Sequence, residues 1–356
     1  MRAATEADIE EAALVVYSSF RAAADAANAY SDTARSPARS KEIVREAVLS
    51  DSIYAMVATV ASDTANGSVS AGAEYIVGFN CLLEANLPLF GMGPLGVRTG
   101  WQGSSIGSQL LQAALARAAT SCADAAKSAG DELHEGKQTQ HLPTVRLTVD
   151  AYNSPALAVY IKAGFVVTEP VTVFEHLPLD VGSTVHPEDA PLGLAAASNG
   201  GLDSLPVVEA TWNFDEMELG DLPTVASLSL LYGGSDRSGE VQAALAAANR
   251  QVYVVREVAS GEVCAYTTGI SFDGHTIASS VPAAIALLNG MRRVDLRAHL
   301  RMMLPLRTAA EVGEHCLRTG WRIVKQLLLM SHGDFRMPQH LEVGVSAGVF
   351  IPTADG

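Results

Sequence analysis

The stretch that decides the fold is LFGMGPLGVRTGWQGSSIGSQLLQAALARA, residues 89–118. Its first part, Leu89–Val97, is apolar and rich in small residues, which predicts a buried strand. A tight polar turn follows, and leucines and alanines then recur at the i, i+3, i+4 spacing of one helix face. A strand, a glycine-bearing turn and a helix N-terminus form an anion site, because unpaired backbone N–H groups converge at the positive end of the helix dipole. Gly103 and Gly107 have no Cβ, so a diphosphate can approach the backbone closely.

A second pattern, TVRLTVDAYNSPALAVYIKAGF, occupies residues 144–165. Its first residues predict a buried strand, and Asn153 is placed to cap the helix that follows. Ala156 and Tyr160 are four residues apart and therefore share a helix face, while Gly164 ends the helix. A capped helix with a small contact residue and a packing tyrosine would explain each position singly. It would not explain why this helix follows the glycine-bearing turn, which can bind a diphosphate, at a sequence separation that fits one domain.

Together the two patterns resemble the GNAT superfamily, the acetyl-CoA-dependent N-acetyltransferases. Gln102-x-x-Ser105-x-Gly107 is similar to the Q/R-x-x-G-x-G/A loop of that family, and residues 153–165 match its N-x-x-A-x-x-x-Y-x-x-x-G-F pattern. The departure is Ser105, which stands where the family has glycine. If this position needs φ > 0, the serine adds strain that affects cofactor affinity rather than the fold.

The resemblance implies acetyl-CoA as the cofactor and a role for particular residues. A backbone N–H between Leu95 and Val97 would bind the thioester oxygen, Asn153 would contact the cofactor arm, and Tyr160 would donate a proton to the departing sulfur. The cofactor-binding residues implied in this way are Leu95, Gly96, Val97, Gln102, Gly103, Ser104, Ser105, Ile106, Gly107, Ser108, Asn153, Ala156 and Tyr160.

The general base is not indicated by the motifs, because Leu89–Val97 contains no acidic residue. Glu74, Glu84 and Asp150 are the nearest carboxylates in sequence, and we take Glu84 and Asp150 as the catalytic candidates beside Tyr160. The function expected is transfer of an acetyl group to a primary amine of a small molecule. Alternatives are a CoA-binding protein without turnover and a protein or peptide N-acetyltransferase.

The composition narrows the partners and the compartment. The net charge of −15 and the absence of a lysine/arginine cluster argue against nucleic acid or an anionic membrane as a partner. The four cysteines are scattered and have no metal-ligand spacing, so we expect no metal and a reducing compartment. The acidic N-terminus lacks the pattern of a signal peptide, and no apolar run is long enough to span a bilayer. These features predict a cytoplasmic protein, either a monomer or a homodimer.

The length of 356 residues and the order of motifs predict two tandem GNAT-like domains. The fold class expected is α/β (α+β), with a mixed, mostly antiparallel sheet flanked by helices in each domain. We place a GNAT domain at residues 1–180, a Gly/Pro/Ser-rich linker at 181–204 and a degenerate GNAT-like domain at 205–356. The resemblance is strong over about residues 1–175 and moderate over 205–356. The second half has no counterpart of the diphosphate turn, because residues 274–280 lead into a helix without the motif.

Overall fold

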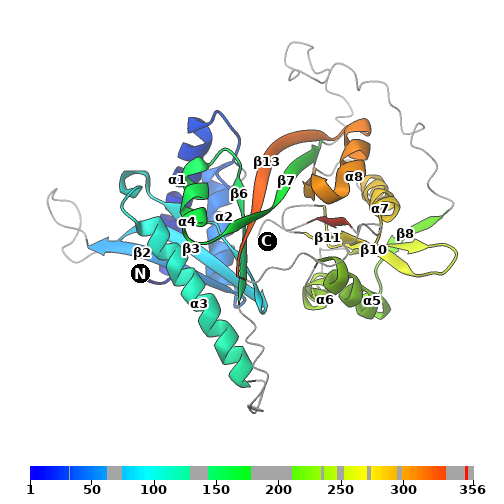
Figure 1. Ribbon diagram of the computed structural model, residues 1–356, viewed down its shortest axis with the longest axis horizontal. Helices are drawn as coiled ribbons and strands as arrows, with labels where there is room; N and C mark the ends of the chain where they lie inside the picture. Colours follow the sequence, from blue (N-terminus) through cyan, green and yellow to red (C-terminus); the bar gives the residue numbers. More distant parts are fainter. Residues whose placement is uncertain are drawn as a thin grey trace, which may run out of the picture. The chain divides into compact units, whose positions relative to one another are not determined.

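The computed structural model describes residues 1–31, 33–61, 74–128, 143–177, 211–233, 236–246, 252–270, 274–294, 299–333 and 349–351 (Figure 1). The chain forms two compact units that are not contiguous in sequence. Unit 1 comprises Met1–Thr168, Leu327–Phe335 and Asp355–Gly356, and unit 2 comprises Glu169–Gln326 and Arg336–Ala354. The predicted linker 181–204 lies outside the described residues.

Unit 1 is a sheet with helices, and its elements follow the order predicted from the sequence. In chain order they are β1 (Arg2–Ala3), the 3₁₀ turn η1 (Glu6–Asp8), α1 (Ile9–Ala26), α2 (Pro37–Leu49), β2 (Ile53–Ala61), β3 (Glu74–Asn86), β4 (Leu89–Met92), β5 (Gly96–Val97), the 3₁₀ turn η2 (Thr99–Trp101), α3 (Ile106–Ser128), β6 (Thr144–Asp150) and α4 (Ser154–Lys162). The strand order is β1-β2-β3-β4-β6, and β5 pairs with β3. All described pairs in this part are antiparallel except β4–β6, which is parallel.

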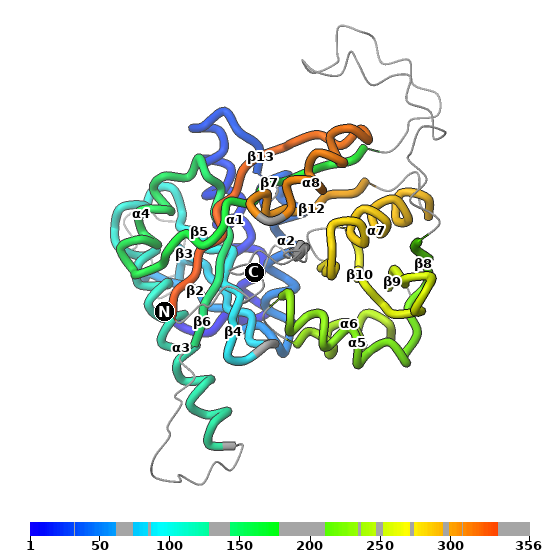
Figure 2. The backbone as a smooth tube through the Cα atoms, turned by 45° about the vertical axis from the view of Figure 1, so that its right-hand side comes forward, coloured from blue at the N-terminus to red at the C-terminus, as the bar shows by residue number. Residues whose placement is uncertain are grey.

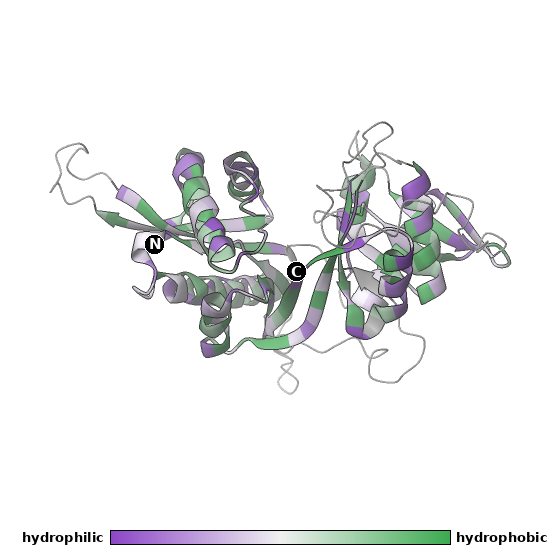
Figure 3. Ribbon diagram, turned by 90° about the horizontal axis from the view of Figure 1, so that it is seen from above, coloured by the Kyte–Doolittle hydropathy of each residue, from purple (hydrophilic) through white to green (hydrophobic). Residues whose placement is uncertain are grey.

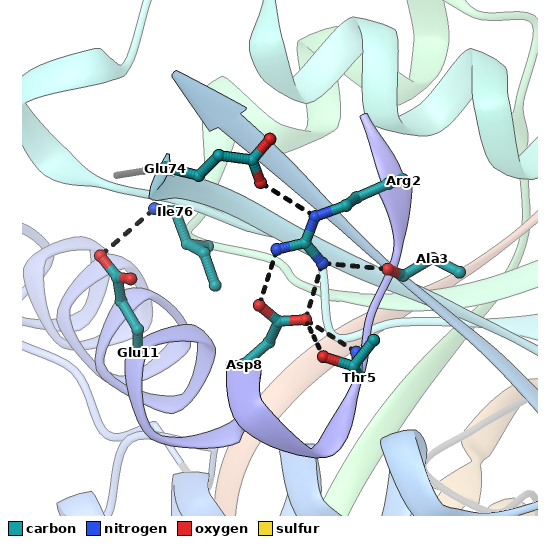
Figure 4. Close-up of polar contacts among 7 residues, drawn as sticks. All are labelled: Arg2, Ala3, Thr5, Asp8, Glu11, Glu74 and Ile76. Atoms are coloured by element: carbon teal, nitrogen blue, oxygen red, sulfur yellow. Dashed lines mark hydrogen bonds and ion pairs between the residues drawn. The ribbon is translucent and has the colours of Figure 1, made fainter. Parts of the chain in front are cut away.

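The start of the chain is fixed by a buried carboxylate (Figure 4). Arg2 donates to both oxygens of Asp8 at 2.7 and 2.8 Å, and the Thr5 N–H donates to Asp8 Oδ2 at 2.7 Å. The hydrogen bond from Arg2 lowers the pKa of Asp8 far below its usual range. This reciprocal cap holds η1 against the short strand β1 and sets the direction of α1.

Unit 2 repeats the same order of elements. They are β8 (Trp212–Glu216), the 3₁₀ turn η5 (Leu219–Asp221), α5 (Leu222–Leu228), the π-helical turn η6 (Ser229–Gly233), α6 (Ser238–Ala246), β9 (Tyr253–Glu257), β10 (Val263–Thr267), β11 (Thr276–Ala278), α7 (Val281–Val294), β12 (Leu300–Pro305), α8 (Leu306–Arg318) and β14 (Val349–Ile351). Here Asp221 caps η5 and accepts from Arg256 at 2.9 and 2.7 Å, as Asp8 does from Arg2 in unit 1. The repetition of elements and caps supports an internal duplication.

One late strand from each half of the chain pairs with a strand of the unit that is formed mainly by the other half. The end of β13 (Arg322–His332) pairs antiparallel with β6 in unit 1, from Leu327 opposite Asp150 to His332 opposite Val145 (Figure 2). The end of β7 (Val166–His176) pairs with β12 in unit 2, from Val171 opposite Pro305 to His176 opposite Leu300. The contiguous domains that we predicted, 1–180 and 205–356, therefore do not coincide with the compact units.

The exchanged strands also contribute residues to the hydrophobic cores; Figure 3 colours the ribbon by the hydropathy of each residue. Met330 of β13 is fully buried with Leu147, Val149 and Phe165 in unit 1. Phe174 of β7 is buried with residues of β12, α7 and α8 in unit 2. Phe174 is only 1% exposed, so the part of the strand that carries it belongs to the second unit.

Helix α3 is longer than the sequence predicted. The polar, small and aperiodic residues from Thr120 to His141 predict a surface insertion, but α3 continues to Ser128, and residues 129–142 lie outside the described part of the chain. Residues 119–128 are rich in alanine, which has the highest helix propensity. They have no apolar periodicity because this end of the helix has little to pack against: among residues 119–127 none is buried.

Candidate functional site

The polar turn before α3 has an unusual backbone. Gly103 has φ 82° and Ser105 has φ 68°, so both adopt the left-handed conformation that favours glycine. The Ser104 hydroxyl donates to the carbonyl of Trp101, which closes the turn on η2. Ser105 is therefore a non-glycine residue with φ > 0, the case in which we expected strain.

The turn and the first turn of α3 present a row of unpaired donors. Among the described residues, the backbone N–H groups of Gly103, Ser105, Ile106, Gly107 and Ser108 have no hydrogen-bond acceptor, and the first helical bond is Gln109 N to Ser105 O at 3.0 Å. These residues are exposed or partly exposed. The donors coincide with the positive end of the dipole of a long helix, so the arrangement can bind a phosphate or diphosphate through the backbone alone.

The sheet opens directly beside this turn. Strands β4 and β6 pair only from Leu89 opposite Thr144 to Gly91 opposite Arg146. Beyond that point β6 continues to Asp150, whereas the segment after β4 no longer pairs with β6 and continues as β5, which pairs with β3. The two strands are thus separated at their carboxyl ends.

Strand β5 directs donors into this opening. Arg98 N donates to Val77 O at 2.9 Å, and Gly96 lies opposite Phe79. Because bonding alternates along an antiparallel pair, the N–H groups of Leu95 and Val97 point away from β3. A Cβ on Gly96 would come within 2.7 Å of Ser19 Oγ and 3.3 Å of Val16 Cα, so this glycine is required for the packing of α1 on β5.

Two further contacts hold β5 in place. The Arg98 guanidinium donates to Glu11 Oε1 at 3.1 Å and to Ile76 O at 3.1 Å, and Glu11 also accepts from the Ile76 N–H. The Gln102 side chain donates to Val97 O at 3.1 Å. Gln102, which we predicted at the cofactor, therefore links the turn to the strand, and its side chain is engaged within the protein.

Tyr160 lies on α4 in the core of unit 1, where its ring centroid is 5.8 Å from that of Phe165. It is 8% exposed, and its hydroxyl forms no hydrogen bond with any residue that the structure describes. Burial raises the pKa of Tyr160 to about 12. The phenol is therefore protonated at neutral pH, but it is a weaker acid than the ordinary tyrosine that we assumed.

The start of α4 also matches the expectation. The Asn153 Oδ1 accepts from the Ala156 N–H at 3.3 Å and caps the helix. This leaves the Asn153 amide NH₂ without an acceptor among the described residues, so it can donate to a ligand.

Asp150 ends β6 at the open side of the sheet. The Tyr152 hydroxyl donates to Asp150 Oδ2 at 3.0 Å and lies 3.3 Å from Tyr30 O. The sequence analysis did not single out Tyr152, which orients the carboxylate. Its position two residues after the aspartate was the signal that could have identified it.

The other carboxylate candidates are engaged elsewhere. Arg117 donates to both oxygens of Glu84 at 2.7 and 2.9 Å, and the Ser121 hydroxyl donates to Glu84 Oε1 at 3.1 Å. These contacts attach α3 to the part of β3 that lies opposite Leu89–Gly91, where β4 and β6 are paired and the sheet is closed. Glu74 is paired with Arg2 at 3.0 Å. The geometry therefore favours Asp150 over Glu84 as the base.

Solved structures share this architecture. A protein of Pyrococcus horikoshii assigned as a candidate acetyltransferase aligns with 100% of this chain and 95% of its own, with a TM-score of 0.58 and 13% identity. A GCN5-related N-acetyltransferase from Sphaerobacter thermophilus aligns with 93% of this chain and 94% of its own, with a TM-score of 0.53 and 14% identity. The chain has the GNAT fold.

A further GNAT structure is a region of a fungal multi-domain β-N-acetylglucosaminidase, named as a GCN5-related glucosamine N-acetyltransferase. It aligns over 93% of this chain and 38% of its own, with a TM-score of 0.56 and 12% identity. No protein-family model matches the sequence, and no curated protein matches it. At these identities the structural likeness establishes the GNAT fold and does not extend to the residues of the site.

The second GNAT unit lacks the features of the first. Strand β11 ends at Ala278 and α7 begins at Val281, so only two residues occupy the place of the diphosphate turn. The N-terminus of α7 is closed by the Ser280 hydroxyl, which accepts from the Ala283 N–H at 3.3 Å. Cys316 takes the place of Tyr160, because Trp321 N bonds to Cys316 O as Phe165 N does to Tyr160 O, each at 3.0 Å.

The described residues contain neither a metal-binding group nor a membrane-spanning helix. No group of three or more histidine, cysteine, aspartate or glutamate side chains among them is arranged to hold a metal ion. Within the same residues, no helix combines the length and the apolar character that a bilayer span requires.

Proposed function

We propose that the chain is an acetyl-CoA-dependent N-acetyltransferase and that unit 1 carries the reaction. The observation that supports this most is the row of N–H groups without a partner among the described residues, those of Gly103, Ser105, Ile106, Gly107 and Ser108, beside the open edge of the sheet. A diphosphate is the group that such a row binds without any basic side chain. The turn has room for the diphosphate. It is exposed, and the space in front of Gly103 is open, because a Cβ added there would have no heavy atom within 4 Å.

The opening between β5 and β6 would receive the pantetheine arm. Acetyl-CoA supplies the acetyl group as a thioester. The N–H groups of Leu95 and Val97 would stabilise negative charge on the carbonyl oxygen, and the Asn153 amide would donate to the arm. These are backbone and amide donors held by packed elements, which is the preorganisation that such stabilisation needs.

Two side chains would move protons. Asp150, held by Tyr152, would take the proton from the attacking amine, directly or through one water molecule. Tyr160 would donate a hydrogen bond to the sulfur as the C–S bond breaks. With a pKa of about 12 its proton stays mainly on the phenol, so it stabilises the thiolate rather than fully protonating it.

The acceptor that we propose is a primary amine of a small molecule. The net charge of −15 favours a cationic amine over an anionic acceptor. A protein or peptide acceptor ranks second. A chain that binds CoA without turnover is the alternative from another class, since Asp150 is the only base that the described geometry favours at the open edge.

A thermal shift with acetyl-CoA, followed by thiol release with a panel of amines, tests the proposal. The panel should contain diamines, an amino sugar (because the fungal region is named for glucosamine) and a lysine peptide. Binding with thiol release from one small amine supports the enzyme. Binding without release from any member indicates a CoA-binding protein, and release with the peptide alone indicates the second candidate. Calorimetry should give one CoA per chain, and two would contradict the difference between the units.

A further inference from the structure

Unit 2 contains an arginine, Arg292, with a buried guanidinium nitrogen and no counter-ion among the described residues. The Nη1 atom of Arg292, in the last turn of α7, is buried and has no hydrogen-bond partner. In the part of the chain that the structure describes, no hydrogen bond or ion pair is formed by any atom of this guanidinium. Burial is also the cause that lowers the pKa of Arg292. A guanidinium does not deprotonate in proteins, so its charge in this position has to be offset by an anion.

The neighbours of Arg292 are polar but uncharged. Asn289 lies one turn earlier on the same face of α7, and its Oδ1 is 3.1 Å from His315 Nε2 on α8. The next residue, Cys316, is buried and bonds through its carbonyl to the Trp321 N–H. The ring of Trp321 packs at 5.4 Å against His176, the last residue of β7. The cluster thus contains one fixed positive charge, two imidazoles, an amide and a thiol, with no carboxylate.

The pKa shifts of the side chains in this cluster agree with an uncompensated positive charge on Arg292. Burial, with a contribution from the charge of Arg292, lowers the pKa of His176 to about 4. The same two causes, in the same order, lower the pKa of His315. Burial raises the pKa of the Cys316 thiol to about 12, so this sulfur stays protonated and does not serve as the counter-ion. Both imidazoles are neutral near pH 7. His176 can donate its one N–H to an anion, whereas the N–H of His315 is donated to Asn289 Oδ1, which leaves the Asn289 amide NH₂ as a donor for the anion.

We propose that Arg292, Asn289 and His176 form a binding site for a small oxyanion, a carboxylate or phosphate group, in the unit that lacks the diphosphate turn, and that His315 orients the Asn289 amide. A cation is excluded by the charge of Arg292, and the histidines and Cys316 do not form a metal-binding group among the described residues. The ordinary explanation for a basic residue in the last turn of a helix is its interaction with the helix dipole. That explanation fits Arg293, which is exposed, but it does not require burying Nη1 of Arg292.

The site makes an unusual prediction for stability. Arg292→Met keeps the length of the side chain and removes the charge. Without added anion it should raise the melting temperature of the full chain by several degrees, because a buried charge without a partner is removed. Arg293→Met is the matched control, since it makes the same change one residue away at an exposed position, where an interaction contributes little to stability, and it should change the melting temperature much less than Arg292→Met does.

The ligand is tested on the full-length wild-type chain and both variants, with inorganic phosphate and with acetate at constant ionic strength set by chloride. Saturating anion should raise the melting temperature of the wild type and of Arg293→Met by a few degrees and should not shift Arg292→Met beyond the general effect of the salt. A response to phosphate alone identifies a phosphate group as the ligand, and a response to acetate alone or to both identifies a carboxylate or a general oxyanion site. The proposal is overturned if neither anion distinguishes the wild type from Arg292→Met. It is equally overturned if Arg292→Met lowers the melting temperature without anion, because the guanidinium then has a structural partner within the chain.

Discussion

Replacing Tyr160 with phenylalanine removes one oxygen atom from the candidate site and little else. The ring contact with Phe165 at 5.8 Å is retained, and the hydroxyl has no partner among the described residues to lose. Acetyl-CoA affinity should therefore stay near that of the wild type. Turnover should fall by about 10²- to 10⁴-fold, the usual effect of a positioned proton donor, which corresponds to roughly 2.7–5.4 kcal/mol in the barrier.

The same substitution has a pH signature that can be worked out from burial. The pKa of Tyr160 is raised from 10.0 to about 12, so the folded chain holds this proton more tightly than the unfolded chain. The resulting stability is fully present below pH 10 and is lost as the pH rises from about 10 through about 12. A shift of this size is worth roughly 2–3 kcal/mol. Between pH 9 and pH 12 the free energy of unfolding should decrease in the wild type and in Tyr160→Phe. The decrease should be smaller in Tyr160→Phe by about this amount.

Urea denaturation at several alkaline pH values measures the stability difference, and thiol release at pH 8 measures turnover. Other buried tyrosines such as Tyr266 are present in both proteins, so their contribution cancels in the comparison. Normal turnover by the variant would remove Tyr160 from the mechanism. Equal alkaline destabilisation of both proteins would show that the hydroxyl is solvated, and the reasoning from burial would then be wrong.

Three further predictions concern the turn and the base. Gly107→Leu should weaken acetyl-CoA binding at least tenfold by calorimetry at an unchanged melting temperature, since a Cβ there meets Val97 at an ordinary 3.5 Å, and the exposed Gly100→Ala is the control. Ser105→Gly should tighten acetyl-CoA binding or leave it unchanged because it relieves φ 68°; a clear loss would show that the hydroxyl contacts a phosphate. Asp150→Asn should lower kcat/KM by about 10²- to 10⁴-fold, whereas Glu84→Gln should cost about 1–3 kcal/mol of stability and leave turnover intact; the opposite result would reverse the choice of base.

The local structure of the site was predictable because local residues determine it. The spacing from Asn153 to Gly164 specifies a capped and terminated helix, and the structure places the cap and the stop at those two residues. A tight turn was expected from the polar, glycine-bearing residues before the helix, and in the structure Gly103 has φ 82°. The condition stated for Ser105, a positive φ, is met for the same reason.

The remaining features depend on partners far away in sequence. Glu84 could not be assigned to α3 in advance, because its partner Arg117 is 33 residues away and is one of many arginines that could reach a carboxylate. The destinations of β7 and β13 were equally hidden. Both strands are largely apolar. Nothing in the identity of the residues that decide their pairing, such as Phe174 and Met330, indicates which of the two cores they enter.

The strand exchange changes what a half-chain can do. A fragment ending at Asp180 would keep Val171, Val173 and Phe174, all buried in the full chain, without the β12 strand that they pair with. It would also lack Leu327–His332, which cover the edge of β6. Exposing those apolar side chains costs roughly 1.5–3 kcal/mol each, and a free strand edge is a template for association.

We therefore expect the fragment 1–180 to aggregate, and we expect a rearranged chain to behave as unit 1. Thr168 Oγ1 donates to Leu329 O at 3.1 Å, so a short Gly/Ser linker can join residue 168 to residue 327. The chain 1–168 joined to 327–335 should be monodisperse by light scattering and should bind acetyl-CoA with the affinity of the full protein, since every proposed contact to the cofactor lies within it. A soluble fragment 1–180 with full binding, or a rearranged chain that does not fold, would mean that the last strands are interchangeable and that the exchange does not govern folding.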